Sequence, residues 1–160
     1  MTEPKIAMPD SDRAAVAHIL NVTLCDLYVV YVKLRNFHWN IEDHHFRDYH
    51  ILFEEQFNQV IQEIDDTAEL VRQYGYLAFG SMKEFTANCR LFEQSSSRLE
   101  SQSMIKQILE DHETLIRYMK ADADTILDKY KDAAAQNFLV DLITKHMKMA
   151  WFIRSNVEKK

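Results

Sequence analysis

Apolar side chains recur along most of this chain at spacings of three and four residues, the period of a helix with one buried face. The first such stripe consists of Val16, Leu20, Leu24, Leu27, Tyr31 and Leu34. It predicts a long first helix that begins near Ser11, a residue type suited to capping a helix N-terminus. The next position on this stripe is His38, so a titratable side chain lies on an otherwise apolar face.

A second stripe predicts a second helix over about residues 44–73. Its members are Phe46, Tyr49, Phe53, Phe57, Val60, Ile64, Ala68 and Val71. Asp43 is expected to cap this helix, and Gly75 follows its end, where a glycine commonly terminates a helix. Residues 41–45 break the period between the two stripes, so the first two helices should form an antiparallel hairpin.

Two further stripes follow a segment that holds both glycines of the chain, Gly75 and Gly80. This segment, 74–94, predicts a long crossover with one short helix at 82–85, capped by Ser81. The expected inward residues of the third helix, which should end near Lys129, are Leu99, Ile105, Ile108, Leu109, Leu115, Ile116 and Met119. Those of the last helix, from about Asp132, are Phe138, Leu142, Ile143, Met147, Ala150 and Trp151. Two helix pairs joined by a long crossover match an all-α four-helix bundle of ferritin-like connectivity.

Length and composition indicate one domain. The 160 residues include only two glycines and two prolines, Pro4 and Pro9, which favours long helices. We expect a flexible tail at 1–10, the bundle at 11–157 and a short tail at 158–160. Cys25 and Cys89 lack metal or redox spacing and should be reduced. No signal peptide is evident and no apolar run approaches the roughly 20 residues of a membrane span, so we expect a cytoplasmic protein with no membrane partner.

Histidines and carboxylates form another stripe beside the core stripe of the second helix. His50 and Glu54 are four residues apart, as are Asp65 and Glu69, so each pair projects from one helical face. If the hairpin turns near residue 44, His38 and His50 lie side by side at its closed end. A lone His38 would more often be a core histidine, and lone acidic residues a solvated face; their combination favours a metal site.

These ligands cannot converge within one chain. His50 and Asp65 are separated by roughly 22 Å along a straight helix. If two copies of the second helix cross antiparallel about a two-fold axis near 57–61, His50 and Glu54 of one copy face Asp65 and Glu69 of the other. The mixed nitrogen and oxygen donors suit Fe(II), Mn(II) or Zn(II), with iron or manganese the first choice.

The remaining histidines and the tryptophans have simpler explanations. Glu42 and His45 have an E-x-x-H spacing but fall at the hairpin turn, which favours the surface. His18, His112 and His146 are expected at capped or solvent-facing positions. Trp39 and Trp151 are expected to be core or interface aromatics.

The sequence Asn36-Phe37-His38-Trp39-Asn40, taken with His50, Asp65 and Glu69, resembles the signature of the Dps mini-ferritins (DNA-binding proteins from starved cells). Residues 80–85 resemble the family's short crossover helix, and His146 with 151–153 its last helix. The similarity runs from about Ala15 to Asn156.

This resemblance implies a hollow homo-dodecamer built from two-fold dimers. Ferroxidase sites at the two-fold interfaces would oxidise Fe(II), preferably with hydrogen peroxide rather than oxygen, and store Fe(III) mineral, which protects against oxidative stress. His38, His50, Asp65 and Glu69 match the family's ligands, and Glu54 stands where the family usually has Asp. The family's acidic three-fold pore maps near Asp128 and Asp132, with Asn137 where an acidic residue can occur, and Asp43 replaces a common glycine.

Two other functions stay open. A DNA-compacting assembly, with iron chemistry secondary or lost through Glu54, would rely on Lys159 and Lys160 repeated over many subunits, against a net charge of −6 that disfavours nonspecific nucleic-acid binding. A structural bundle without metal is the third reading. The sequence also leaves open the preferred oxidant, the number of metal ions per site and the iron capacity.

Overall fold

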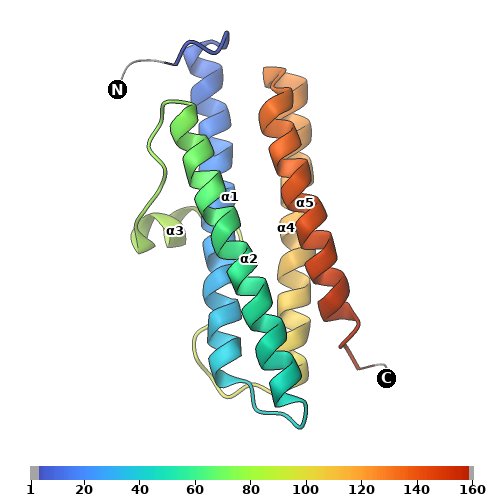
Figure 1. Cartoon of the computed structure of the whole chain (residues 1–160). Helices are drawn as coiled ribbons and strands as arrows, with labels where there is room; N and C mark the ends of the chain where they lie inside the picture. Colours follow the sequence, from blue (N-terminus) through green and yellow to red (C-terminus); the bar gives the residue numbers. More distant parts are fainter. Residues whose placement is uncertain (1–3, 159–160) are drawn as a thin grey trace.

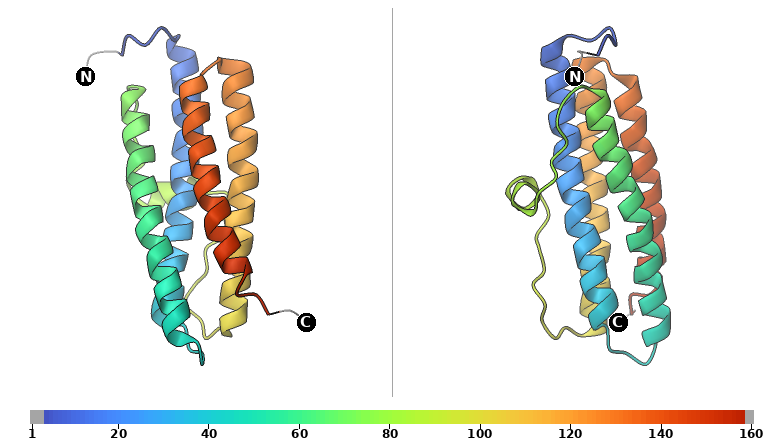
Figure 2. Two further views of the ribbon diagram at one scale, coloured as in Figure 1. Left: turned by 45° about the vertical axis from the view of Figure 1, so that its right-hand side comes forward. Right: turned by 60° about the vertical axis from the view of Figure 1, so that its left-hand side comes forward.

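The computed structural model describes residues 4–158. Within this range the chain forms five helices and no strand: α1 (Asp10–Asn40), α2 (Phe46–Gln73), α3 (Met82–Asn88), α4 (Ser101–Tyr130) and α5 (Ala133–Arg154). Helices α1 and α2 pack as one antiparallel pair and α4 and α5 as another (Figure 1). Helix α3 lies in the crossover, beside α1 and outside the bundle (Figure 2). The predicted all-α four-helix bundle with a short extra helix is confirmed.

The helix ends follow local capping chemistry. Ser81 and Glu84 form a capping box at α3, in which each side chain accepts from the other's backbone N–H. Asp132 accepts from two backbone N–H groups at the start of α5. Gly75, at φ +88°, lies just beyond α2, where an L side chain would be strained.

Helices α1 and α2 do not begin at the predicted residues. Helix α1 begins at Asp10 after Pro9, so Ser11 lies inside the helix. Helix α2 begins at Phe46, because Asp43 forms a tight turn in which its side chain accepts from the N–H of His45 over 2.8 Å. Of the expected N-terminal tail, residues 1–3 lie outside the described part, and Met8 packs against the core. The flexibility of that tail stays a prediction.

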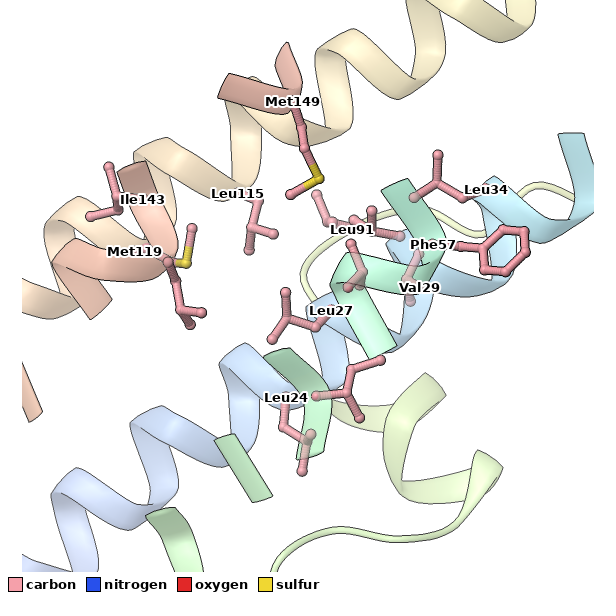
Figure 3. Packing of buried hydrophobic residues seen from close by; sticks show 14 of the residues in the cluster. Leu24, Leu27, Val29, Leu34, Phe57, Leu91, Leu115, Met119, Ile143 and Met149 are labelled. Atoms are coloured by element: carbon pink, nitrogen blue, oxygen red, sulfur yellow. The ribbon is translucent and has the colours of Figure 1, made fainter. Parts of the chain in front are cut away.

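The hydrophobic core fills the space between the four long helices. Leu24 and Leu27 of α1, Leu115 and Met119 of α4 and Met149 of α5 belong to this one core (Figure 3). Every member of the first predicted stripe is buried except Tyr31, which is partly exposed. Burial of these apolar side chains is the main force that stabilises such a fold.

Three side chains predicted to face inward are exposed instead. Phe46 is 45% exposed, Met147 53% and Trp151 59%. On α5 the reason is the phase of the helix, because the buried stripe runs through Leu142, His146 and Met149. Met147 and Trp151 each follow a buried residue by one position, which turns them by about 100° away from the core.

Helix α1 is long and apolar enough to cross a membrane by length and composition, since an 18-residue window reaches a mean hydropathy of 1.6. This differs from the expectation that no run of the chain approaches that length. However, 61% of the window is buried inside the bundle, and the core helix of a helical bundle passes the same test.

Candidate metal centre

His38 and His50 meet at the closed end of the α1–α2 hairpin, as expected from their positions about the turn. Their rings stack with centroids 3.7 Å apart and planes inclined by 21°. His38, in the last turn of α1, is buried, whereas His50 of α2 is partly exposed. The pair therefore lies at the edge of the core, within reach of solvent.

Each of these rings is held by the backbone of the other residue. Nδ1 of His38 lies 2.8 Å from the carbonyl oxygen of His50, and Nδ1 of His50 lies 2.8 Å from the carbonyl oxygen of His38. A carbonyl oxygen only accepts hydrogen bonds, so both Nδ1 atoms carry the proton. In the neutral rings Nε2 is then a lone-pair donor, the state in which histidine binds a metal.

The end of α1 explains why this arrangement forms. The last four carbonyl groups of a helix lack N–H partners from the helix itself. Ile41 donates its N–H to Phe37, and the His50 ring supplies the donor for the next carbonyl, that of His38. The turn between α1 and α2 thereby fixes the orientation of both rings.

Aromatic side chains border the histidine pair. Phe57 meets His38 edge-on with centroids 5.2 Å apart, and Phe46 lies 5.0 Å from His50. The Arg35 guanidinium lies over Trp39 and over Phe57, 4.7 and 5.1 Å from the ring centroids. Trp39 is 63% exposed, so it is not a core residue of this chain, and an interface position stays a prediction.

The three expected carboxylates remain apart from a complete site. Glu54, Asp65 and Glu69 are exposed on α2, Glu54 one turn beyond His50 and the other two near the opposite end of the helix. Among residues 4–158, no group of three or more His, Cys, Asp or Glu side chains could hold a metal ion. The predicted ligands therefore lie in two separate places: His38, His50 and Glu54 are called here the candidate histidine half-site, and Asp65 and Glu69 the candidate carboxylate half-site.

The expectation that His112 and His146 are capped or solvent-facing is wrong. Both are fully buried between the helices, where their Nδ1 atoms lie 2.8 Å apart. His112 also contacts Gln56, and His146 contacts Glu63, which are both buried on α2. The sequence held a signal for this arrangement, because His112 continues the buried stripe of Ile108 and Leu115 at spacings of four and three.

Other predicted positions are distributed over the surface. Glu42 and His45 are exposed at the hairpin turn, and His18 is exposed on α1. Asp128 is exposed, whereas Asp132 caps α5 and accepts a hydrogen bond from the Tyr74 hydroxyl. Lys159 and Lys160, on which the DNA-binding alternative depends, lie outside the described residues.

Comparison with known proteins agrees with this architecture. A family model described as a ferritin-like domain matches residues 17–160. An uncharacterized low temperature-induced protein from Nostoc sp. is 33% identical over 158 residues, covering 99% of this chain and 88% of that protein. A DNA protection during starvation protein from Helicobacter pylori is 27% identical over 139 residues, covering 87% and 96%.

Solved structures show the same fold. Dps from Thermosynechococcus elongatus is 25% identical with a TM-score of 0.87 and 94% coverage of both chains. DpsC from Streptomyces coelicolor, at 21% identity, has a TM-score of 0.94 over 99% of this chain and 92% of its own. The bundle and its crossover helix are thus those of the ferritin-like class. This chain belongs to the ferritin-like family. Its similarity to proteins named Dps, in sequence and in fold, confirms the predicted resemblance.

Proposed function

We propose that this protein is a mini-ferritin that oxidises Fe(II) at sites shared between two subunits and stores the Fe(III) product. Membership of the family supports an iron-storage role. The observation that carries the proposal is the His38–His50 pair, because its backbone hydrogen bonds occupy both Nδ1 atoms and leave Nε2 of each stacked ring without a partner on the opposite backbone. Histidine nitrogen with carboxylate oxygen is a donor set suited to Fe(II).

The proposed site is completed by a second copy of the chain. Residues 50 and 54 lie as far before position 59.5 of α2 as residues 69 and 65 lie after it, so a two-fold axis there exchanges the two half-sites. His38, His50 and Glu54 would then face Asp65 and Glu69 of the partner subunit. Two equivalent sites form per dimer, and six such dimers would make the proposed hollow dodecamer.

The proposed reaction balances with hydrogen peroxide as the oxidant. Two Fe(II) ions lose one electron each, and the peroxide takes up both electrons and two protons to give two water molecules. Hydrolysis of Fe(III) then releases protons and forms the mineral. The carboxylates stabilise the additional positive charge of Fe(III), and the imidazoles hold Fe(II) in place before it is oxidised.

A mixing experiment tests the shared site. His50→Ala and Asp65→Ala subunits should each be inactive in peroxide-dependent Fe(II) oxidation, followed by absorbance of the ferric product. In a His50→Ala/Asp65→Ala hybrid dimer, one site carries both changes and the other carries neither. Random co-assembly after dissociation should therefore restore activity at about a quarter of the sites.

Controls separate this result from simple refolding. Each variant refolded alone must remain inactive, and the double variant His50→Ala with Asp65→Ala in one chain must gain nothing from mixing with itself. Co-assembled protein without activity, despite hybrid dimers in native mass spectrometry, would show that the half-sites do not combine. Wild-type protein that does not accelerate Fe(II) oxidation with either peroxide or oxygen would refute the ferroxidase proposal.

A further inference from the structure

A continuous chain of hydrogen-bonded side chains lies in the core beneath α2. Gln56 Oε1 is 3.1 Å from His112 Nε2. Nδ1 of His112 is 2.8 Å from Nδ1 of His146, whose Nε2 is 2.9 Å from Glu63 Oε2. These four residues, here called the buried polar chain, are each at most 4% exposed. Polar groups buried this deeply are costly unless every link is made.

Both ends of the buried polar chain are anchored. Nε2 of Gln56 donates to the carbonyl oxygen of Met149 over 3.2 Å, and Nε2 of Gln59 donates to Glu63 Oε1 over 3.2 Å. Helix α2 pairs with α1, and α5 pairs with α4, so these side chains connect one helix pair with the other.

The direction of each hydrogen bond follows from the Met149 carbonyl, which only accepts. Gln56 must turn its amide nitrogen toward that carbonyl and its oxygen toward His112. His112 therefore carries its proton on Nε2 and accepts at Nδ1 from His146. Burial, and next the charge of His146, lower the pKa of His112 well below 6.5, which agrees with a neutral ring.

The hydrogen bond between His146 and Glu63 needs one further proton. Because His146 donates through Nδ1, a neutral ring would present a lone pair at Nε2 to the Glu63 carboxylate. The contact at 2.9 Å therefore holds an additional proton between the two groups. A glutamine at position 63 would supply its own N–H to His146 and would still accept from Gln59, so it would preserve the chain without that proton.

The position of the buried polar chain on α2 relates it to the half-sites. Gln56 and Glu63 are seven residues, or about two turns, apart and share the inward side of the helix. Glu54 lies two residues before Gln56, and Asp65 lies two residues after Glu63. Each is thereby about 200° around the helix from its buried neighbour. In agreement, Glu54 and Asp65 are exposed.

We propose that the buried polar chain positions α2, by fixing the rotation of this helix about its axis and thereby the direction in which Glu54 and Asp65 point. The consequence for iron rests on the proposed function, whereas the rotation of α2 can be observed without it. The hydrogen bonds of Gln56 and Glu63 hold the part of α2 that lies between Glu54 and Asp65. One connection on the inward side of the helix therefore fixes the direction of both carboxylates.

Two substitutions at one position test this role in the full-length, assembled protein. Glu63→Met keeps the length of the side chain but cannot accept from His146, and Glu63→Gln restores the link. Crystal structures should show α2 rotated relative to α1 in Glu63→Met and unchanged in Glu63→Gln. In Fe(II) oxidation, Glu63→Met should raise the KM for Fe(II) about tenfold with a smaller effect on kcat, and Glu63→Gln should retain wild-type values.

The outcomes are distinct. An assembled Glu63→Met protein with α2 unmoved and wild-type KM would overturn the positioning role. Equal impairment of both variants, with α2 in place, would also overturn it, because Glu63 would then act through its charge. If Glu63→Met does not fold, Gln56→Leu, which breaks the other end of the buried polar chain, should show the same rotation of α2 and the same rise in the KM for Fe(II). If the wild type does not oxidise Fe(II), the proposed function fails, and the position of α2 in the crystals still decides this inference.

Discussion

The imidazoles of His38 and His50 each donate to the backbone carbonyl of the other residue over 2.8 Å. This exchange joins the last turn of α1 to the first turns of α2 and fixes the tautomer of both rings. The two side chains thus have a structural role, and in the proposed metal site they would have a chemical role as well, so their substitutions should have two separable effects.

His50→Phe should abolish tight binding of Co(II), a redox-stable substitute for Fe(II), in calorimetry. An aromatic ring at position 50 retains the stacking on His38 but lacks a nitrogen lone pair. It also leaves the His38 carbonyl without its donor, so the free energy of unfolding should fall by about 1 kcal/mol. His18→Phe, a change at an exposed position of α1, is the control and should leave Co(II) binding unchanged. Unchanged binding in His50→Phe would exclude His50 as a ligand.

Glu54→Gln should slow Fe(II) oxidation, because a neutral amide stabilises the charge of Fe(III) less well than a carboxylate. Glu54→Asp, which keeps the charge and introduces the residue usual in the resembled family, should oxidise Fe(II) faster than Glu54→Gln. Initial rates at saturating peroxide give this order. Glu55 is the neighbouring exposed carboxylate, so Glu55→Gln is a matched control that should leave the rate unchanged. A wild-type rate in Glu54→Gln would remove Glu54 from the proposed ligands.

Arg90→Ala should destabilise the fold by about 3–5 kcal/mol, because it removes the partner of a buried charge. Arg90 reaches Asp26 and Asp122, each over 2.8 Å, and Asp26 is completely buried. Burial raises the pKa of Asp26, although Arg90 opposes the shift. The control Arg98→Ala breaks an exposed pair with Glu42 and should change stability by no more than about 0.5 kcal/mol. Urea unfolding measures both, and equal effects would contradict the prediction.

The stability of the protein should depend on His112 in mildly acidic solution. Its folded pKa is lowered, so below the unfolded value of 6.5 the unfolded chain takes up a proton that the folded chain does not bind. The free energy of unfolding should therefore fall as the pH drops below 6.5, by at most about 1.4 kcal/mol per pH unit for this group. His112→Asn should reduce that slope in urea unfolding between about pH 7 and about pH 5, whereas His18→Asn at an exposed site should not. An unchanged slope in His112→Asn would contradict a neutral buried ring.

Much of the fold was predictable because helix periodicity is a local property. The stripe from Val16 to Leu34 specifies one helix and the capping residue Ser81 another, each through interactions with residues close in sequence. The pairing of His38 with His50 was predictable too, since both lie at equal distances from a turn. By contrast, Asp43 ended up in the turn before α2 because its side chain and backbone bond to residues 45 and 46.

The sequence by itself determined the helices, their order and the residues of the two candidate half-sites on α1 and α2, because these depend on spacing along one chain. Only the tertiary structure decided the fate of His112 and His146, since their partners Gln56 and Glu63 come from a helix distant in sequence. It also decided which ring nitrogen of His38 and His50 carries the proton, because backbone carbonyls opposite each ring select the tautomer.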